Sequence, residues 1–348
     1  MTAVPSRSVP NPSEPLRQHL QSVLARLPGA PLLTGCERLS GGASQETWLL
    51  RLAGPAGADR LILRRSPQGN NFRRAIAAGL GTEAQVITLA QAAGVPVPGI
   101  VATLIAKDEL GEGFLCQYVE GESIPRRILR DARFEAVRPR LARQCGEVLA
   151  RIHAIEMPPT LPLQELPAAA KLEQLELQYR RQQLPRPVFE FALRWLHQHL
   201  PRPAAAPCLV HGDFRNGNLL IDHSGIAAVL DWELAHRGEA LEDLGWLCVP
   251  SWRFGLLDRP VGGFGHIEEL IAGYEGAGGA RVDRQRLFFW TVFGSLFWGV
   301  TCTEFALEFR RGDRALERAV IGRRSSETEL DLLWLLDAAG AARRPAPP

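Results

Sequence analysis

One continuous stretch, Cys208 to Glu233, combines a polar loop with a pair of short apolar segments. It reads CLVHGDFRNGNLLIDHSGIAAVLDWE. An apolar run ends at Val210, and His-Gly-Asp follows at once. The segments Leu219–Asp222 and Ile226–Leu230 flank a His-Ser-Gly turn, which predicts a tight antiparallel hairpin. The second segment ends at Asp231, so we expect the hairpin to fold this aspartate back beside the polar loop.

Polar residues in this stretch have the spacing that phosphoryl transfer requires. The reaction depends on a carboxylate near the acceptor hydroxyl and on oxygen ligands that hold Mg²⁺ against the phosphates of ATP. Asp213 is the candidate for the first role, and Asn218 and Asp231 are the candidates for the second. Their order is that of the catalytic loop and metal-binding aspartate of protein kinases. Arg215 is a further candidate, because its charge could neutralise the transferred phosphoryl group.

Two motifs read together, HGDFRNGNLL and VLDWELAHRGEALEDLGWL, resemble the aminoglycoside-phosphotransferase-like kinase family. That family has His-Gly-Asp where protein kinases have His-Arg-Asp, and Ile-Asp-Trp-Glu or Ile-Asp-Phe-Glu where they have Asp-Phe-Gly. The resemblance extends over roughly Leu32 to Leu336. Its C-terminal region, with Tyr274 and the apolar segment Leu287–Leu307, looks most like the acyl-CoA-dehydrogenase-associated branch. The family implies an α+β, bilobal protein-kinase-like fold, with an antiparallel β-sheet and one main helix in the N-lobe and a mostly helical C-lobe.

Hydrophobic periodicity predicts the elements of both lobes. We expect a nucleotide-binding N-lobe over residues 14–119 and a C-lobe with the catalytic loop and acceptor site over 120–340. Residues 1–13 and 341–348 are expected to be a disordered lead-in and tail. In the N-lobe we expect strands at Leu32–Leu39, Glu46–Leu52, Arg60–Arg65, Val101–Lys107 and Gly113–Val119, and a main helix that starts at the N-cap Thr82. The last C-lobe helices are expected at His266–Tyr274, Arg284–Phe309 and Arg314–Leu336.

Small residues separate the first two strands, where a backbone can approach a phosphate closely. They are Ser40, Gly41, Gly42, Ala43 and Ser44. The segment resembles the nucleotide-covering loop of the family, which is written S-G-G-x-S/T-N. Gln45 stands at the position of the usual asparagine. The alternative is an ordinary hairpin turn without a ligand.

The third strand, RLILRR, lacks the lysine that contacts the α- and β-phosphates in kinases. Lys107 and Lys171 are the only lysines of the chain, and Arg64 occupies the matching place. Strand alternation is expected to point Arg65 to the other face. The resemblance implies that Glu83 orients Arg64. The alternatives are a surface arginine at a strand end and a helix acid favoured by the helix dipole.

The resemblance also implies a hinge after the last N-lobe strand. Cys116 would line the back of the adenine pocket, and the backbone groups of Gln117 and Val119 would bond the adenine edge. In the C-lobe, Asp243 matches an aspartate that stabilises the catalytic loop. We interpret His153 as a core or helix-end histidine.

Composition describes an ordinary globular protein, with 46% hydrophobic and 22% charged residues. The net charge of +2 gives no indication of a nucleic-acid partner. Six scattered cysteines without a C-x-x-C pair, and an N-terminus without an apolar signal segment, predict a cytoplasmic protein with reduced thiols. Leu287–Leu307 is long and apolar, but its polar residues favour a buried helix over a membrane span. No feature predicts an oligomeric state.

The sequence therefore predicts an ATP- and Mg²⁺-dependent small-molecule kinase. The C-lobe loops contain no dense acidic run, which favours a less cationic metabolite over an aminoglycoside antibiotic as the acceptor. The resemblance to the acyl-CoA-dehydrogenase-associated branch implies a hydroxyacyl-type or similar metabolite. A catalytically silent nucleotide-binding pseudokinase stays open, because the usual lysine is missing. A metallohydrolase built on His211, Asp213 and Asp231 is disfavoured, because no second histidine clusters with them.

Overall fold

The computed structural model describes residues 14–39, 45–54, 57–67, 78–202, 206–312 and 316–341. These residues divide into two compact units. The first unit contains the chain up to Glu120 together with Pro158–Leu163 and Leu230–Ala235. The second unit contains residues 121–157, 164–229 and the chain from 236 onward. The segment that carries Asp231 therefore packs as part of the first unit, although it directly follows the hairpin of residues 219–229 in the sequence.

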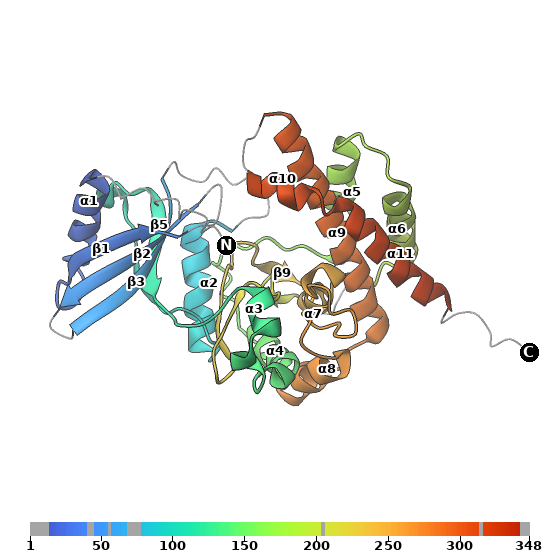
Figure 1. Ribbon diagram of the computed structural model, residues 1–348, viewed down its shortest axis with the longest axis horizontal. Coiled ribbons are helices and arrows are strands. Elements are labelled where there is room, and N and C mark those ends of the chain that lie inside the picture. The colour runs from blue at the N-terminus through green and yellow to red at the C-terminus, as the bar shows by residue number, and fades with distance from the viewer. Residues whose placement is uncertain are drawn as a thin grey trace, which may run out of the picture. The chain divides into compact units, whose positions relative to one another are not determined.

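The first unit is built on a five-stranded antiparallel sheet in the order β1-β2-β3-β5-β4 (Figure 1). Strands β1, β2 and β3 pair in chain order, whereas β5 lies between β3 and β4. The elements are α1 (Glu14–Leu24), β1 (Leu32–Arg38), β2 (Glu46–Gly54), β3 (Gly57–Ser66), α2 (Leu80–Ala92), β4 (Ile100–Thr103), the short 3₁₀ helix η1 (Ala106–Asp108) and β5 (Glu112–Gln117).

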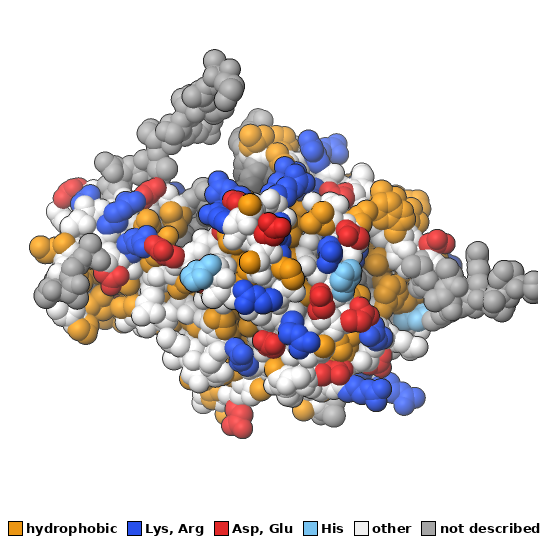
Figure 2. Space-filling view, turned by 60° about the horizontal axis from the view of Figure 1, so that its bottom comes forward, with side chains coloured by type: hydrophobic (Ala, Val, Ile, Leu, Met, Phe, Trp, Pro, Cys, Tyr) orange, Lys and Arg blue, Asp and Glu red, His pale blue; other side chains and the backbone are white. Residues whose placement is uncertain are grey.

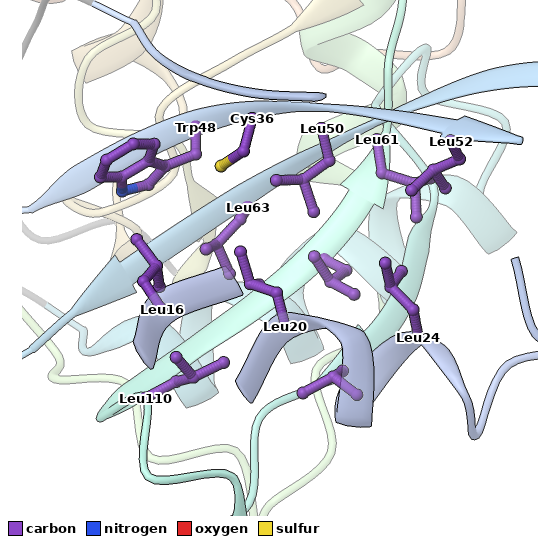
Figure 3. Packing of buried hydrophobic residues seen from close by; sticks show 12 residues of the cluster. Leu16, Leu20, Leu24, Cys36, Trp48, Leu50, Leu52, Leu61, Leu63 and Leu110 are labelled. Atoms are coloured by element: carbon purple, nitrogen blue, oxygen red, sulfur yellow. The ribbon is translucent and has the colours of Figure 1, made fainter. Parts of the chain in front are cut away.

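Helix α1 covers one face of this sheet. Its apolar stripe, Leu16, Leu20 and Leu24, packs on leucines of the middle strands, among them Leu50 and Leu63 (Figure 3). All five side chains are buried. Because side chains alternate along a strand, Arg64, which follows Leu63 on β3, points to the opposite face of the sheet.

The start of helix α2 and the end of strand β4 are two of the boundaries in the first unit that differ from the sequence expectation. Helix α2 begins at Leu80 after Gly79, whose φ of 83° favours glycine, so Thr82 lies inside the helix and is not its N-cap. Strand β4 ends at Thr103 instead of Lys107. The chain turns there because the Asp108 carboxylate accepts the Ile105 N–H at 2.9 Å and binds Arg26.

The second unit is mostly helical and contains two small ladders, β6 with β9 and β7 with β8. Its early elements are α3 (Pro125–Arg130), η2 (Ala132–Phe134), α4 (Arg138–His153), α5 (Ala168–Arg181) and α6 (Pro187–Gln198). The ladder strands are β6 (Cys208–Val210), β7 (Leu219–Ile221), β8 (Ile226–Val229) and β9 (His236–Gly238). The later elements are α7 (Leu241–Leu247), η3 (Pro250–Trp252), α8 (Ile267–Gly276), α9 (Arg284–Arg310), α10 (Leu316–Gly322) and α11 (Ser325–Ala341).

Helix α9 is the central helix of the second unit and packs against α5, α6, α7, α10 and α11. It approaches α7 closely at Gly245, where an added Cβ would lie 2.5 Å from the Cβ of Trp290. The expectation of a buried core helix is confirmed, since most residues between Leu287 and Thr303 are buried. In the described part of the chain, no helix combines the length and the apolar character that a membrane crossing needs.

The expected single helix Arg314–Leu336 is instead two helices, α10 and α11, which are separated after Gly322. Gly322 lies against Ala306 of α9, so that an added Cβ would come within 2.9 Å of its backbone. A glycine at the end of α10 therefore permits this close packing on α9. Figure 2 shows that positive and negative side chains are interspersed on one face of the molecule.

Candidate active site

The polar loop begins directly after β6, and a buried aspartate on α7 fixes its backbone. Asp243 accepts the N–H of His211 at 2.8 Å and the N–H of Gly212 at 2.9 Å. Its Oδ2 also lies 3.1 Å from His153 Nε2, and Tyr274 Oη lies 3.0 Å from the other ring nitrogen of this histidine. Burial opposes the charge of Asp243, yet the His153 contact and the loop N–H groups lower its pKa. The expected contact between Asp243 and this loop is present, and His153 is a core histidine.

The Asp213 carboxylate receives hydrogen bonds on both oxygens. Oδ1 accepts from Arg215 Nε at 3.0 Å and from Trp246 Nε1 at 2.7 Å. Oδ2 accepts from Asn218 Nδ2 at 2.7 Å, and the same amide nitrogen lies 2.9 Å from the backbone oxygen of Asp213. The structure therefore brings together three of the predicted residues, Asp213, Arg215 and Asn218, within the second unit.

Arg215 is held in place on two sides. Its guanidinium carbon lies 4.7 Å from the centre of the Trp252 ring, in a cation–π arrangement. Gly217, with a φ of 117°, lies so close that an added Cβ would be 2.7 Å from Arg215 Nη1. These contacts keep the positive charge of Arg215 beside the Asp213 carboxylate.

Arg64 forms a second cluster, in the first unit, on the sheet face opposite α1. Its Nη1 lies 3.0 Å from Oε1 of Glu83 on α2. Its Nη2 lies 3.2 Å from Asp231 Oδ1 and 2.8 Å from Gln45 Oε1. Arg65 binds Glu46 instead, at 2.8 Å. The predicted Arg64–Glu83 ion pair is therefore present, and Asp231 joins it.

Electrostatics in this second cluster oppose burial. Burial alone would lower the pKa of Arg64, but the carboxylates of Glu83, Asp231 and Glu233 raise it. Glu83 is 1% exposed, and burial raises its pKa to about 7 even though Arg64 acts in the opposite direction. Carboxylates crowded around one guanidinium in this way are a common feature of functional sites.

Asp231 has an unusual backbone, with a φ of 66°. Aspartate tolerates this left-handed conformation better than most residues, but it still costs about 1 kcal/mol or more. The neighbouring Trp232 is fully buried, and Glu233 accepts the Ala78 N–H through its backbone oxygen at 2.9 Å. Its side chain lies 3.5 Å from Gln45 Nε2. The 230–235 segment thus holds the Asp231 carboxylate toward Arg64.

Asn218 of the second unit and Asp231 of the first unit each carry a side-chain oxygen of the kind that magnesium binds. Both hydrogen-bonding contacts of the Asn218 amide use Nδ2, so that Oδ1 remains available as an oxygen ligand. Asp231 contacts Arg64 through Oδ1, and its side chain is 35% exposed. Within the described ranges, no cluster of three His, Cys, Asp or Glu residues could hold a metal ion.

The predicted hinge residues lie at the end of β5. Cys116 is buried, and burial raises the pKa of its thiol. The N–H of Gln117 donates to Gly99 O at 2.9 Å, so an adenine contact by the backbone of this residue would use its carbonyl. The predicted loop residues Ser40, Gly41, Gly42, Ala43 and Ser44 lie outside the described residues.

Sequence reasoning missed the contacts of Gln45 and Trp246. In the sequence Gln45 stands out only as a departure from the usual asparagine, and its contact with Arg64 joins residues 19 apart. Trp246 lies three residues after Asp243 on α7, so both share one face of this helix. That spacing is the signal that could have identified Trp246, because Asp243 was already expected at the loop.

Comparison with known proteins decides the family. The profile of the phosphotransferase enzyme family APH matches residues 35–280. The chain belongs to this family. The APH chain is also 30% identical to acyl-CoA dehydrogenase family member 10 of Mus musculus, over 68% of this chain and 22% of that protein. It is 30% identical to acyl-CoA dehydrogenase family member 11 of Gallus gallus, over 68% of this chain and 32% of that protein. The chain thus spans about a fifth to a third of these relatives.

Solved structures show the fold of this APH protein. Spectinomycin phosphotransferase, solved with ADP and spectinomycin, has a TM-score of 0.62 at 13% identity, with 91% of this chain and 98% of that chain covered. A choline/ethanolamine kinase family protein of Mesorhizobium loti has a TM-score of 0.57 at 19% identity, with 91% and 94% covered. The predicted bilobal, kinase-like α+β fold and the resemblance to the acyl-CoA-dehydrogenase-associated branch are therefore confirmed.

Proposed function

We propose that this APH protein is an ATP-dependent kinase that transfers the γ-phosphoryl group to a hydroxyl of a small molecule. The observation that carries the proposal is the Asp213 carboxylate, which is fixed by three donors and lies beside the Asn218 amide. Asp213 positions the acceptor hydroxyl and accepts its proton. A fixed carboxylate suits this role because phosphoryl transfer depends mainly on positioning and charge.

Asn218 and Asp231 are the proposed magnesium ligands, through Asn218 Oδ1 and the carboxylate of Asp231. A bound Mg²⁺ would neutralise charge on the phosphate oxygens. Asn218 is preset for this role because its amide nitrogen is engaged by Asp213, which points the amide oxygen away from that residue. The left-handed backbone of Asp231 is the kind of local strain that clusters at functional positions.

The nucleotide is proposed to lie against the first unit. Arg64, held by Glu83, would grip phosphate oxygens, and the backbone of Ser40, Gly41, Gly42, Ala43 and Ser44 would cover them. The Gln117 carbonyl and the Val119 N–H would bond the adenine edge. Val119 N–H donates to no atom of the described residues, which leaves it available. Arg215 would neutralise charge on the transferred group.

The acceptor is proposed to be a metabolite without multiple positive charges. Asp213 is surrounded by the cationic Arg215 and by the aromatic rings of Trp246 and Trp252. A polyamine would meet the Arg215 guanidinium at short range, and like charges in contact are unfavourable. A hydroxyacyl-type or similar acceptor avoids this repulsion. The six free cysteines are consistent with the cytoplasmic location that we also propose.

Two experiments test the class of function. Calorimetry with ATP in the presence and absence of Mg²⁺ should show magnesium-dependent binding that weakens in Asp231→Asn. Absence of nucleotide binding in the wild type would contradict the proposal. The second experiment measures ADP release with a range of hydroxyl acceptors. If the chain binds nucleotide but releases ADP with none of them, a catalytically silent module is favoured. The absent lysine is the observation that supports this alternative.

A further inference from the structure

The hydrogen bonds on Asp213 are unevenly divided between its two oxygens. Oδ1 accepts two donors, Arg215 Nε and Trp246 Nε1, whereas Oδ2 accepts only Asn218 Nδ2 among the described residues. A carboxylate offers about two acceptor positions on each oxygen. Both positions of Oδ1 are therefore in use, and the position that remains is on Oδ2.

Trp246 is held rigidly where it donates this bond. It is 7% exposed, and its ring packs edge-on against Trp252 at 5.1 Å and Phe297 at 5.7 Å. Gly294 lies under the indole, since an added Cβ there would be 3.0 Å from Trp246 Cε3. Rotation of the indole would break these contacts, so the N–H direction is set by the packing of α7 against α9.

The same helix fixes the loop backbone on the other side of Asp213. Asp243, one turn before Trp246, holds the N–H groups of His211 and Gly212. Helix α7 thus determines both the position of the loop and the rotation of the Asp213 carboxylate. If only the loop backbone were held, the Asp213 carboxylate could rotate about its side-chain bonds. Here Asp243 holds the backbone before Asp213 and Trp246 holds the carboxylate itself, so this rotation is restricted.

We infer that Trp246 is a positioning residue that turns Asp213 so that Oδ2, and not Oδ1, receives the acceptor hydroxyl. The inference rests on the proposed kinase function. The proton of the hydroxyl moves to Oδ2 as the oxygen bonds to the γ-phosphorus and the bond from that phosphorus to the leaving ADP oxygen breaks. Trp246 itself touches neither reactant and acts only through Asp213.

Tryptophan side-chain resonances test the contact independently of the reaction. The full chain has eight tryptophans, so its ¹H–¹⁵N spectrum should contain eight indole N–H signals. Trp246→Phe identifies the Trp246 signal by its loss. Asp213→Asn should then shift this signal, because a charged acceptor becomes a neutral one, and should leave the Trp298 signal in place. An unshifted Trp246 signal overturns the inference.

Steady-state ADP release tests the consequence for turnover. Trp246→Phe keeps an aromatic ring but removes the N–H, and should lower kcat by ~10- to 100-fold, the usual effect of a lost hydrogen bond to a charged group. The KM for ATP should change by less than ~2-fold, because a positioning contact to Asp213 does not bind ATP.

The matched control is Trp298→Phe. Trp298 belongs to the same aromatic cluster, 4.9 Å from Trp252, but its Nε1 has no hydrogen-bond partner among the described residues. This variant should retain kcat, and thermal unfolding of both variants reports any shared loss of packing. Equal kcat values in the two variants overturn the inference about Trp246 but leave the proposed kinase function standing. A wild-type chain that binds no Mg-ATP overturns the proposed function and the role of Oδ2, while the resonance test still decides the Trp246–Asp213 contact.

Discussion

Arg64 Nη1 lies 3.0 Å from Oε1 of Glu83, a carboxylate that is almost completely buried. The other terminal nitrogen of the same guanidinium contacts both Gln45 and Asp231. One arginine fork therefore connects the start of β2, the helix α2 and the 230–235 segment. A lysine ammonium is a compact charge on a flexible stem and could not span these three partners in the same way. Arginine at this position is part of a network and not a simple replacement for lysine.

Replacing Arg64 with lysine should weaken Mg-ATP binding. The variant loses at least one charge-assisted hydrogen bond of about 1.5 kcal/mol, so the Kd measured by calorimetry should rise by ~10-fold. Arg65→Lys is the matched control, because Arg65 is the adjacent arginine and binds Glu46 on the other face. Its Kd should stay within ~2-fold of the wild-type value. Equal losses in both variants would contradict the role of Arg64.

Glu83 should make part of the folding stability depend on pH. Its pKa in the folded chain is about 7, above the ordinary value of 4.5. Between these values the folded state keeps a proton that the unfolded chain has released, so this contribution to stability falls as pH rises from 4.5 to 7. Urea unfolding at pH 5 and pH 7.5 should show that the wild type loses more stability than Glu83→Gln, by ~1–3 kcal/mol. Identical pH dependence of stability in both proteins would disprove the link between Glu83 protonation and folding.

Asp243→Asn should destabilise the second unit strongly. The buried carboxylate accepts two loop N–H groups and contacts His153, and an amide cannot replace all of these acceptor contacts. The expected loss of unfolding free energy is ~2–4 kcal/mol, measured by chemical denaturation at pH 7. Asp258→Asn is the control, since Asp258 is 77% exposed and should change stability by less than ~0.5 kcal/mol. A loss of stability no larger than that of the control would contradict the role of Asp243 in holding the loop backbone.

Asp331→Asn should have the opposite effect on stability and raise the free energy of unfolding. Asp331 is buried, and burial together with Glu327 raises its pKa to about 6, despite Arg253 and Arg324. Its ionisation between its ordinary pKa of 3.8 and pH 6 therefore costs stability. At pH 7.5 the variant should be more stable than the wild type by ~1–2 kcal/mol, and at pH 4 the two should be similar. Thermal unfolding at both pH values measures the difference in stability between the variant and the wild type. A variant that is less stable than the wild type at pH 7.5 would exclude a cost of ionising Asp331.

Local patterns in the sequence predicted what depends on neighbouring residues. The β7–β8 hairpin, the alternation that separates Arg64 from Arg65 and the buried α9 all follow from hydrophobic spacing. The helix start was misplaced because Thr82 is a good N-cap in isolation, whereas the φ of 83° at Gly79 decides where the helix begins. A single helix was expected after α9 because packing of Gly322 on Ala306 cannot be read from periodicity.

The site could be predicted only as a set of residue types. Spacing identified Asp213, Asn218 and Asp231, and the resemblance supplied Arg64 and Glu83. The bonds from Trp246 to Asp213 and from Arg64 to Gln45 join positions 33 and 19 residues apart. They depend on how α7 packs on α9 and how β2 pairs with β3, and the one local signal is the three-residue spacing from Asp243 to Trp246.

The central claim is that Asp213 positions an acceptor hydroxyl for phosphoryl transfer from ATP. The most direct measurement is magnesium-dependent ADP release with aminoglycosides, choline-like amino alcohols, sugars and hydroxyacyl thioesters as acceptors, in the wild type and in Asp213→Asn. We predict release that depends on one acceptor class other than the polycationic aminoglycosides, because of Arg215, and that falls by at least ~100-fold in the variant. Acceptor-dependent release that persists undiminished in Asp213→Asn would contradict the account.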